Sequence, residues 1–261
     1  MTGVAGMYDH LFAMSDDLGT FEHAEYRIPR RRHGYCVDDV ARVLIVVARE
    51  PHSSQDLLRL ARTSFRFLTE AQAVDGRVRN RRAQTGRWVG RRGVGDAWGR
   101  SVWAFGTAAR RAPERWMADS ARAYFERGTE QRSTWPRAMA FAALGAAEIL
   151  TVDPTHRRAR ALLGDAAAII GRSGPDPDWL WPEARLTYAN AALPEALIAA
   201  GQLLEQPQVL ADGLAMLEWL VDRETVDGHL SVTPVGGASK GDASGRFDQQ
   251  PIEVAALADA C

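Results

Sequence analysis

Two kinds of helical segment alternate along this chain, and this alternation constrains the fold more than any other feature. Apolar residues recur in both kinds with a period of about 3.6 residues, and short loops rich in Gly, Pro and Asp separate the segments. The predicted helices span Val37–Arg49, Ser54–Ala73, Asp96–Arg111, Pro113–Gly128, Trp135–Thr151, Pro154–Arg172, Thr187–Glu205, Pro207–Glu224 and Pro251–Cys261. The sequence therefore predicts an almost entirely helical protein.

The third, fifth and seventh segments are apolar on nearly every face, as in Val102–Gly106 and Ala140–Gly145. A helix that is apolar all round is buried on all sides. The even-numbered segments carry charged stripes instead, such as Arg59, Arg62 and Arg66. Buried inner helices that alternate with amphipathic outer helices form two concentric rings. The predicted fold class is therefore all-α, an (α/α) toroid of helical hairpins.

Residues 1–261 are expected to form one such domain. Five inner-helix starts can be counted, so we expect the toroid to lack its C-terminal hairpin. An open ring would expose apolar helix faces, which favours association with another chain or a second copy.

An internal repeat supports this organisation. Val74–Gly76 follows one outer helix and Val226–Gly228 follows another, and both contain the Asp-Gly pair of a tight turn. A short stretch with strand-like alternation follows each turn, at 77–79 and at 229–232. Each stretch then enters a Gly-rich loop that leads to the next inner helix.

Composition excludes several classes of partner. The formal net charge is −1 and 46% of the 261 residues are hydrophobic, so no general attraction to nucleic acid or to an anionic membrane is expected. No uninterrupted apolar run of about 20 residues is present, and the start of the chain has no secretory signal. We therefore expect a cytoplasmic protein without a membrane partner.

Motifs for cofactor chemistry are also absent. The two cysteines have no metal-ligand spacing, and no H-E-x-x-H, G-x-S-x-G or phosphate-loop motif occurs. Gly95–Gly99 follows no predicted strand of a βαβ unit, so it is not a dinucleotide-binding motif. We expect neither a metal nor a cofactor.

Polar residues gather where the inner helices begin, and these helix starts should surround one mouth of the toroid. The candidate catalytic carboxylates are Asp38, Asp39, Asp96, Glu183, Asp248 and Glu253. The candidate substrate-binding residues are Tyr35, Arg42, Trp98, Arg100, Trp135, Arg137, Trp179, Trp181, Tyr188, Asn190, Gln249 and Gln250. Carboxylates, amides and arginines pair with sugar hydroxyls, and aromatic rings stack on apolar sugar faces.

Each of these residues also has an ordinary structural explanation. Asp is a favoured N-cap, and Asp38 with Arg42 is a common i,i+4 pair. Trp179 and Trp181 are explained equally well by two roles, contact with the sugar or filling of the space between helices. If Glu183 instead faces the cavity beside Trp, burial would raise its pKa and suit it to general-acid work. Asp38 or Asp39, at a helix N-terminus, would stay ionised and act as a base or hydroxyl acceptor.

The sequence resembles bacterial six-hairpin glycosidase-like proteins over nearly its whole length. The resemblance lies in 14–24, 33–42, 95–100, 181–190 and 247–251. Where those relatives often have Asp-Asp-Asn-Ala-Arg, this chain has Val40 in place of Asn. The resemblance implies an (α/α)6 toroid and a carbohydrate ligand. Some of those relatives are fused to a glycosyltransferase domain, which implies a possible glycosyltransferase partner.

Three functions remain open. Paired carboxylates favour a glycoside hydrolase that acts on an oligosaccharide or glycan. A noncatalytic sugar-binding module that serves a glycosyltransferase is the first alternative. A sugar epimerase or isomerase is the second, and the scattered histidines argue weakly against it because such enzymes normally use a His pair.

Overall fold

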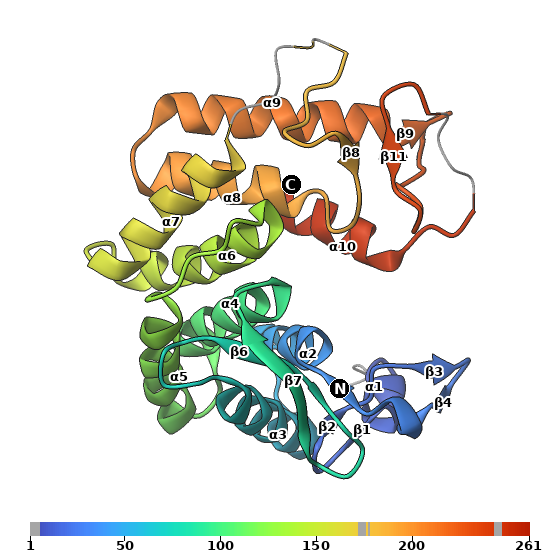
Figure 1. Cartoon of the computed structure of the whole chain (residues 1–261), viewed down its shortest axis with the longest axis vertical. Helices are drawn as coiled ribbons and strands as arrows, with labels where there is room; N and C mark the ends of the chain where they lie inside the picture. Colours follow the sequence, from blue (N-terminus) through green and yellow to red (C-terminus); the bar gives the residue numbers. More distant parts are fainter. Residues whose placement is uncertain (1–5, 172–175, 177, 243–246) are drawn as a thin grey trace.

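The computed structural model describes residues 6–171, 176, 178–242 and 247–261, and helices dominate it (Figure 1). The inner helices are α2 (Val37–Arg49), α4 (Asp96–Arg111), α6 (Pro136–Val152), α8 (Ala192–Leu203) and α10 (Pro251–Ala260). The outer helices are α3 (Gln55–Ala71), α5 (Arg115–Gly128), α7 (Arg157–Ile170) and α9 (Pro207–Arg223). A short helix, α1 (Asp9–Ala13), precedes them. The helices follow an open ring, which confirms the predicted all-α toroid.

Burial separates the two rings as the sequence pattern predicts. In α6 nearly every residue from Arg137 to Leu150 is buried, whereas only one face of α5 is buried, through residues such as Met117, Ala121 and Phe125. The inner helices contact one another in chain order, and each outer helix packs on the inner helix beside it. The hydrophobic core is therefore a continuous layer between the rings.

Glycines bring α4 and α6 into backbone contact. A Cβ atom at Gly99 would overlap the carbonyl of Ala138, and one at Gly106 would overlap the carbonyl of Gly145. A Cβ atom at Gly145 would in turn overlap the carbonyl of Val102. Only glycine permits this approach. The first turns of α4 and α6 are thus held in a fixed relation, and both turns carry candidate site residues.

Several predicted helix bounds were wrong by a few residues. Helix α7 begins at Arg157 rather than Pro154, because the side chain of His156 caps it by accepting from the amide of Ala159. Its predicted end at Arg172 lies outside the described residues. Helix α5 begins two residues later than predicted, at Arg115.

The start of α8 is the larger error. The predicted helix began at Thr187, but α8 begins at Ala192 because Ala189 has a left-handed φ of 45°. The side chain of Asn190 accepts a hydrogen bond from the amide of Thr187 at 2.9 Å and stabilises a turn in place of helix. Residues 187–191 thus form a loop with a defined turn at the mouth, and not the first turns of α8.

Short strands occupy the loops that lead into the inner helices. These strands are β1 (Ser15–Asp16), β2 (Gly19–Thr20), β3 (Ala24–Glu25), β4 (Ile28–Pro29), β5 (Tyr35–Cys36), β6 (Val78–Arg82), β7 (Trp88–Gly93), β8 (Arg185–Leu186), β9 (Thr225–Val226), β10 (His229–Leu230) and β11 (Ala238–Ser239). The largest sheet has the order β5-β6-β7. The predicted repeat is confirmed, since Gly76 and Asp227–Gly228 form left-handed turns before β6 and β10.

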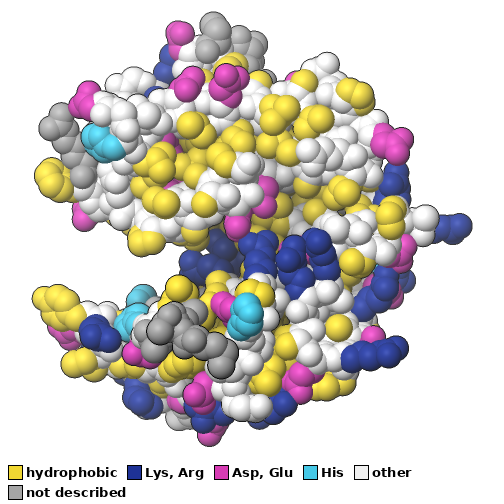
Figure 2. All heavy atoms as spheres, turned by 180° about the vertical axis from the view of Figure 1, so that it is seen from behind, with side chains coloured by type: hydrophobic (Ala, Val, Ile, Leu, Met, Phe, Trp, Pro, Cys, Tyr) yellow, Lys and Arg dark blue, Asp and Glu magenta, His cyan; other side chains and the backbone are white. Residues whose placement is uncertain are grey.

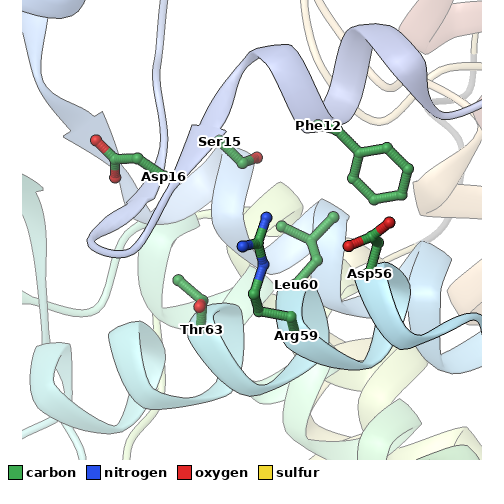
Figure 3. A pocket seen from close by; sticks show the side chains of 7 residues that line it. All are labelled: Phe12, Ser15, Asp16, Asp56, Arg59, Leu60 and Thr63. Carbon is green, nitrogen blue, oxygen red and sulfur yellow. The ribbon is translucent and has the colours of Figure 1, made fainter.

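The N-terminal segment packs against α3 and leaves one small pocket between them (Figure 3). Its walls include Ser15 and Asp16 from β1 and Arg59 and Thr63 from α3. Its volume of about 20 Å³ suits a single water molecule. A sugar ring does not fit in this pocket. No described helix is long and apolar enough to cross a bilayer.

Candidate functional site

A cavity of about 490 Å³ opens at the mouth of the ring. It is lined by Asp38, Arg42, Asp96, Arg100, Tyr188, Gln250, Pro251 and Ile252. The first six were predicted as site residues, and they come from α2, α4, α10 and the loop before α8. Figure 2 shows a deep cleft between the two halves of the molecule, with Lys and Arg side chains gathered along its floor. The cavity is large enough for a sugar.

Asp38 and Arg100 form the most buried charged pair of this cavity. The Nε atom of Arg100 lies 3.6 Å from Oδ1 of Asp38, and the Arg100 side chain is only 5% exposed. The guanidinium also lies 3.8 Å from the centroid of the Phe141 ring. Oδ1 of Asp38 is buried and has no hydrogen-bond partner among the described residues. The carboxylate of Asp38 therefore lines the cavity with one oxygen buried against the Arg100 guanidinium.

A second pair faces the same cavity. The hydroxyl of Tyr188 donates to Oδ2 of Asp96 at 2.6 Å. Burial and this carboxylate raise the pKa of Tyr188 well above its usual value, so the phenol remains protonated at neutral pH. The pair offers one O–H group and one carboxylate to a ligand in the cavity.

Arg137 fixes the loop that carries Tyr188. Its guanidinium donates to the carboxylate of Glu183 at 2.5 Å, to the carbonyl of Tyr188 at 2.6 Å and to the side-chain oxygen of Asn190 at 2.9 Å. Arg137 and Asn190 are buried, and none of these residues except Tyr188 lines the cavity. The general-acid role of Glu183 and the ligand contacts of Arg137 and Asn190 stay predictions, and the hydrogen bonds of these residues position the loop.

Glu253 was predicted as a catalytic candidate, and its surroundings indicate another role. It is 2% exposed, and its carboxylate accepts from the amides of Ala189 and Asn190 and from the side chain of Asn190. Burial raises its pKa despite these donors. Glu253 therefore links α10 to the loop before α8. Its carboxylate stabilises the left-handed backbone conformation of Ala189 by accepting from the amide of that residue.

The expectation that Asp39 stays ionised remains a prediction, and two opposing influences act on its carboxyl group. Burial raises the pKa of Asp39, although its ion pair with Arg42 opposes the shift. Asp39 does not line the mouth cavity. Its partner Arg42 does, so Asp39 orients a cavity residue rather than facing the ligand.

Most of the predicted stacking aromatics belong to the core. Trp98 is fully buried and donates to the carbonyl of Gly128 at 3.1 Å. Tyr35 is also buried and donates to Asp16 at 2.8 Å. Trp179 and Trp181 pack against Trp219 of α9, which is the plug that the alternative reading described. Of the predicted tryptophans only Trp135, at the start of α6, is exposed.

The segment before α10 contributes through one residue. Gln250 lines the cavity, whereas Asp248 and Gln249 are exposed and lie outside it. The side chain of Gln249 donates to Ser231 at 3.0 Å. The backbone carbonyl of Asp248 accepts a hydrogen bond from the amide of Val235 at 3.0 Å. This bond holds the loop and does not involve the Asp248 carboxylate.

A second cavity of about 360 Å³ adjoins the mouth cavity, because Arg42, Arg100 and Ile252 line both. The prediction missed its most unusual residue, Glu195 of α8. This carboxyl lies beside Trp103 and Phe141, and burial raises its pKa to about 8, with the nearby carboxylates of Asp259 and Glu148 adding to the shift and Arg49 opposing it. The sequence did contain a signal for this residue, because Glu195 is the single carboxylate of the otherwise largely apolar inner helix α8.

Glu195→Gln is expected to stabilise the protein at high pH. The unfolded carboxyl ionises above about pH 4.5, while the folded one keeps its proton to about pH 8. Between these values the free energy of unfolding of the wild type falls by up to about 1.4 kcal/mol per pH unit. We expect the variant to equal the wild type at pH 4 and to be more stable at pH 8, by up to about 5 kcal/mol if the full shift from 4.5 to about 8 applies, as measured by urea unfolding.

The matched control is Glu218→Gln, at an exposed position of α9. It should leave the pH dependence of unfolding unchanged. An equal effect of Glu195→Gln at both pH values would show that the folded carboxyl ionises normally.

No protein-family model matches the sequence, and no significantly similar protein is found among curated ones. Among solved structures, the chain is similar to a sugar epimerase from a ruminal bacterium, with a TM-score of 0.66 and 12% identity over 90% of this chain and 72% of that one. It is also similar to the cellobiose 2-epimerase from Spirochaeta thermophila DSM 6192, with a TM-score of 0.50 and 12% identity over 95% and 91% of the two chains. At this identity the likeness shows a shared fold.

The residues that line the mouth cavity set the chemistry available there. No histidine is among them, and the exposed rings of His23 and His33, 4.7 Å apart, lie outside it. No group of three or more metal-ligating side chains occurs among the described residues. The charged and acidic groups that line the cavity are the carboxylates of Asp38 and Asp96, the phenol of Tyr188 and the guanidinium groups of Arg42 and Arg100.

Proposed function

We propose that this protein binds a carbohydrate in the mouth cavity and acts on it as a sugar epimerase or isomerase. The observation that carries the proposal is the Asp38 carboxylate paired with the buried Arg100, in one cavity with the Tyr188–Asp96 pair. The fold shared with two sugar epimerases favours this reading over hydrolysis.

The proposed reaction moves one proton at the carbon next to the carbonyl of the open-chain sugar. Asp38 takes the proton from this carbon, and the electron pair of the C–H bond moves toward the carbonyl oxygen. Arg100 stabilises the negative charge that develops on that oxygen, because a buried cation acts more strongly than an exposed one. Return of a proton to the opposite face of the same carbon gives the epimer, and the Tyr188 hydroxyl is the proposed donor.

Glycoside hydrolysis is the second candidate, and one observation favours it. Asp38 and Asp96 line the same cavity in unlike surroundings, one beside a guanidinium and the other bonded to a phenol. Two carboxylates in unlike surroundings are the usual equipment of a glycosidase. Partnership with a glycosyltransferase, without turnover of the sugar, is a third reading that the same experiment tests.

The experiment is a panel of reducing mono- and disaccharides incubated with the protein in D2O and followed by proton NMR. Epimerisation or isomerisation gives a new sugar that carries deuterium at the carbon next to the carbonyl. New reducing ends without such deuterium would indicate hydrolysis instead. Saturation transfer from protein to sugar without any product would indicate a binding module. If no sugar shows turnover or saturation transfer, the carbohydrate proposal is wrong.

A further inference from the structure

Positive charge is concentrated in the hairpin formed by β6 and β7. Seven of the 17 residues at 77–93 are arginine, and none is acidic. This segment, called here the arginine ribbon, therefore carries a formal charge of +7 in a chain whose net charge is −1, which leaves −8 on all other residues together. Such a separation of charge attracts an anion to the ribbon and disfavours its binding elsewhere on the surface.

Most arginines of the ribbon are not neutralised by a carboxylate of the protein. Three form ion pairs, namely Arg77 with Asp75, Arg81 with Glu22 and Arg82 with Glu70. Arg79, Arg87, Arg91 and Arg92 form no ion pair with any described residue, and the last three are exposed. The Nε atom of Arg79 is buried and has no hydrogen-bond partner in the described part of the chain. Four positive charges therefore lack an internal counterion.

The pairing of the two strands brings like charges together. Arg79 lies directly opposite Arg92, and like charges in a cross-strand pair destabilise a sheet. Between Arg79 and Arg81 the register shifts, so that three steps along β7 match two along β6. Gly90 has a left-handed φ of 80° at this bulge, and the neighbouring Arg91 and Arg92 are both exposed. A bound anion would offset the repulsion within this arrangement.

The end of the ribbon that carries this arginine pair borders the mouth cavity. Strand β6 contacts both α2 and α4 (Figure 1). The side chain of Asn80 accepts from the amide of Val37 at 3.2 Å, one residue before Asp38. Arg92 precedes Asp96 by four residues, so their Cα atoms lie at most about 14 Å apart. Because Asp38 and Asp96 line the cavity, a ligand of a few sugars that is held in the mouth can extend onto the ribbon.

We propose that the substrate is an acidic oligosaccharide with a free reducing end, whose terminal sugar occupies the mouth cavity while the uronic acids of its chain lie on the arginine ribbon. This inference rests on the proposed function and narrows its substrate class to oligosaccharides that contain uronic acids. The free reducing end supplies the open-chain carbonyl at which the proposed proton transfer takes place.

The distribution of the arginines favours uronic acids over other polyanions. From Arg87 to Arg92 the strand extends by up to roughly 17 Å, so the unpaired guanidinium groups are spread along the ribbon and not gathered in one cluster. A chain with one carboxylate per sugar matches this spread, and a guanidinium group binds a carboxylate through two parallel hydrogen bonds. A long nucleic acid would extend beyond the ribbon and meet the net negative charge of the other residues.

The test compares trigalacturonic acid with its trimethyl ester by calorimetric titration of the full chain. The two ligands share one backbone and a free reducing end, and they differ in the charge of their carboxyl groups. We expect the acid to bind at least about tenfold more tightly at low ionic strength, because hydrogen bonds between ionised partners are strong. In about 0.5 M salt the difference should fall below about threefold, since salt screens exposed charges.

The double variant Arg79→Gln/Arg92→Gln removes the charged pair nearest the mouth. We expect it to fold, because it removes a repulsive cross-strand pair, and to bind trigalacturonic acid at least about fivefold more weakly than the wild type. Arg115→Gln is the matched control, at a side chain of α5 that is 94% exposed, and it should keep the wild-type affinity. Affinity of the double variant within about twofold of the wild type would overturn the inference.

Further outcomes separate this inference from the proposed function. Deuterium next to the carbonyl of the reducing sugar, after incubation of trigalacturonic acid in D2O, would support both. An equally strong preference for monomeric galacturonate over its methyl ester would place the anion in the mouth and overturn the inference. Competition by an oligothymidylate of equal charge, as effective as trigalacturonic acid itself, would indicate a nucleic-acid surface and also overturn it.

Equal affinity for the acid and its ester, together with turnover of neutral reducing sugars, would overturn the role of the ribbon and leave the proposed function standing. Absence of binding and turnover with every sugar would overturn both.

Discussion

Asp38→Asn is expected to lower the turnover of the sugar substrate by a factor of about 100 to 10,000, the usual contribution of a general base. The amide keeps the size of the side chain but has no basic oxygen with which to take a proton. The measurement is the rate of deuterium incorporation by proton NMR under saturating substrate. Thermal unfolding should show a loss of stability, because the substitution removes the carboxylate that pairs with the buried Arg100, so the rates are compared at a temperature at which both proteins are folded.

The matched control is Asp119→Asn, an exposed position of α5 that faces no cavity. It should retain full activity. If Asp38→Asn keeps activity within about threefold of the wild type, Asp38 is not the base, and Asp96 becomes the carboxylate to test.

Arg137→Ala is expected to lower the free energy of unfolding by about 3–5 kcal/mol, the range for removal of one partner from a buried charged pair. The substitution leaves the carboxylate of Glu183, the carbonyl of Tyr188 and the side chain of Asn190 without their shared donor. Urea unfolding followed by tryptophan fluorescence measures the change.

Arg115→Ala provides the comparison, since this arginine is 94% exposed and pairs only with Asp119 on its own helix. Its loss should cost less than about 0.5 kcal/mol. Arg137→Lys should resemble Arg137→Ala, because an ammonium group cannot reproduce three directed guanidinium contacts. A loss below about 1 kcal/mol in Arg137→Ala would mean that the loop before α8 has other supports.

The polar residues of the mouth were predictable because they follow from helix periodicity. Asp96 and Arg100 are four residues apart on α4 and therefore lie on one face. Trp98, midway between them, points to another face, and the same periodicity indicated that it could not share the cavity. The prediction erred there by grouping residues according to sequence proximity.

Other features required the tertiary structure. Glu253 could not be distinguished from a catalytic carboxylate by sequence, because its partners are backbone amides 63 and 64 residues away. The plug formed by Trp179 and Trp181 depends on Trp219 of an outer helix. The cytoplasmic location, the single-domain organisation and a glycosyltransferase partner stay predictions.

The contact between the backbones of α4 and α6 divides the candidate site into a rigid and an adaptable part. Asp96 and Arg100 stand on one side of a joint that admits no side chain, so the distance between α4 and α6 cannot relax. Ile252 is instead part of α10, and Gln250 directly precedes this helix. Helix α10 is joined to the ring through Glu253 and through the pair of Asp259 with Arg49. Selection for a new ligand would therefore act first on α10 and its preceding loop, while Asp96 and Arg100 on α4 keep their places.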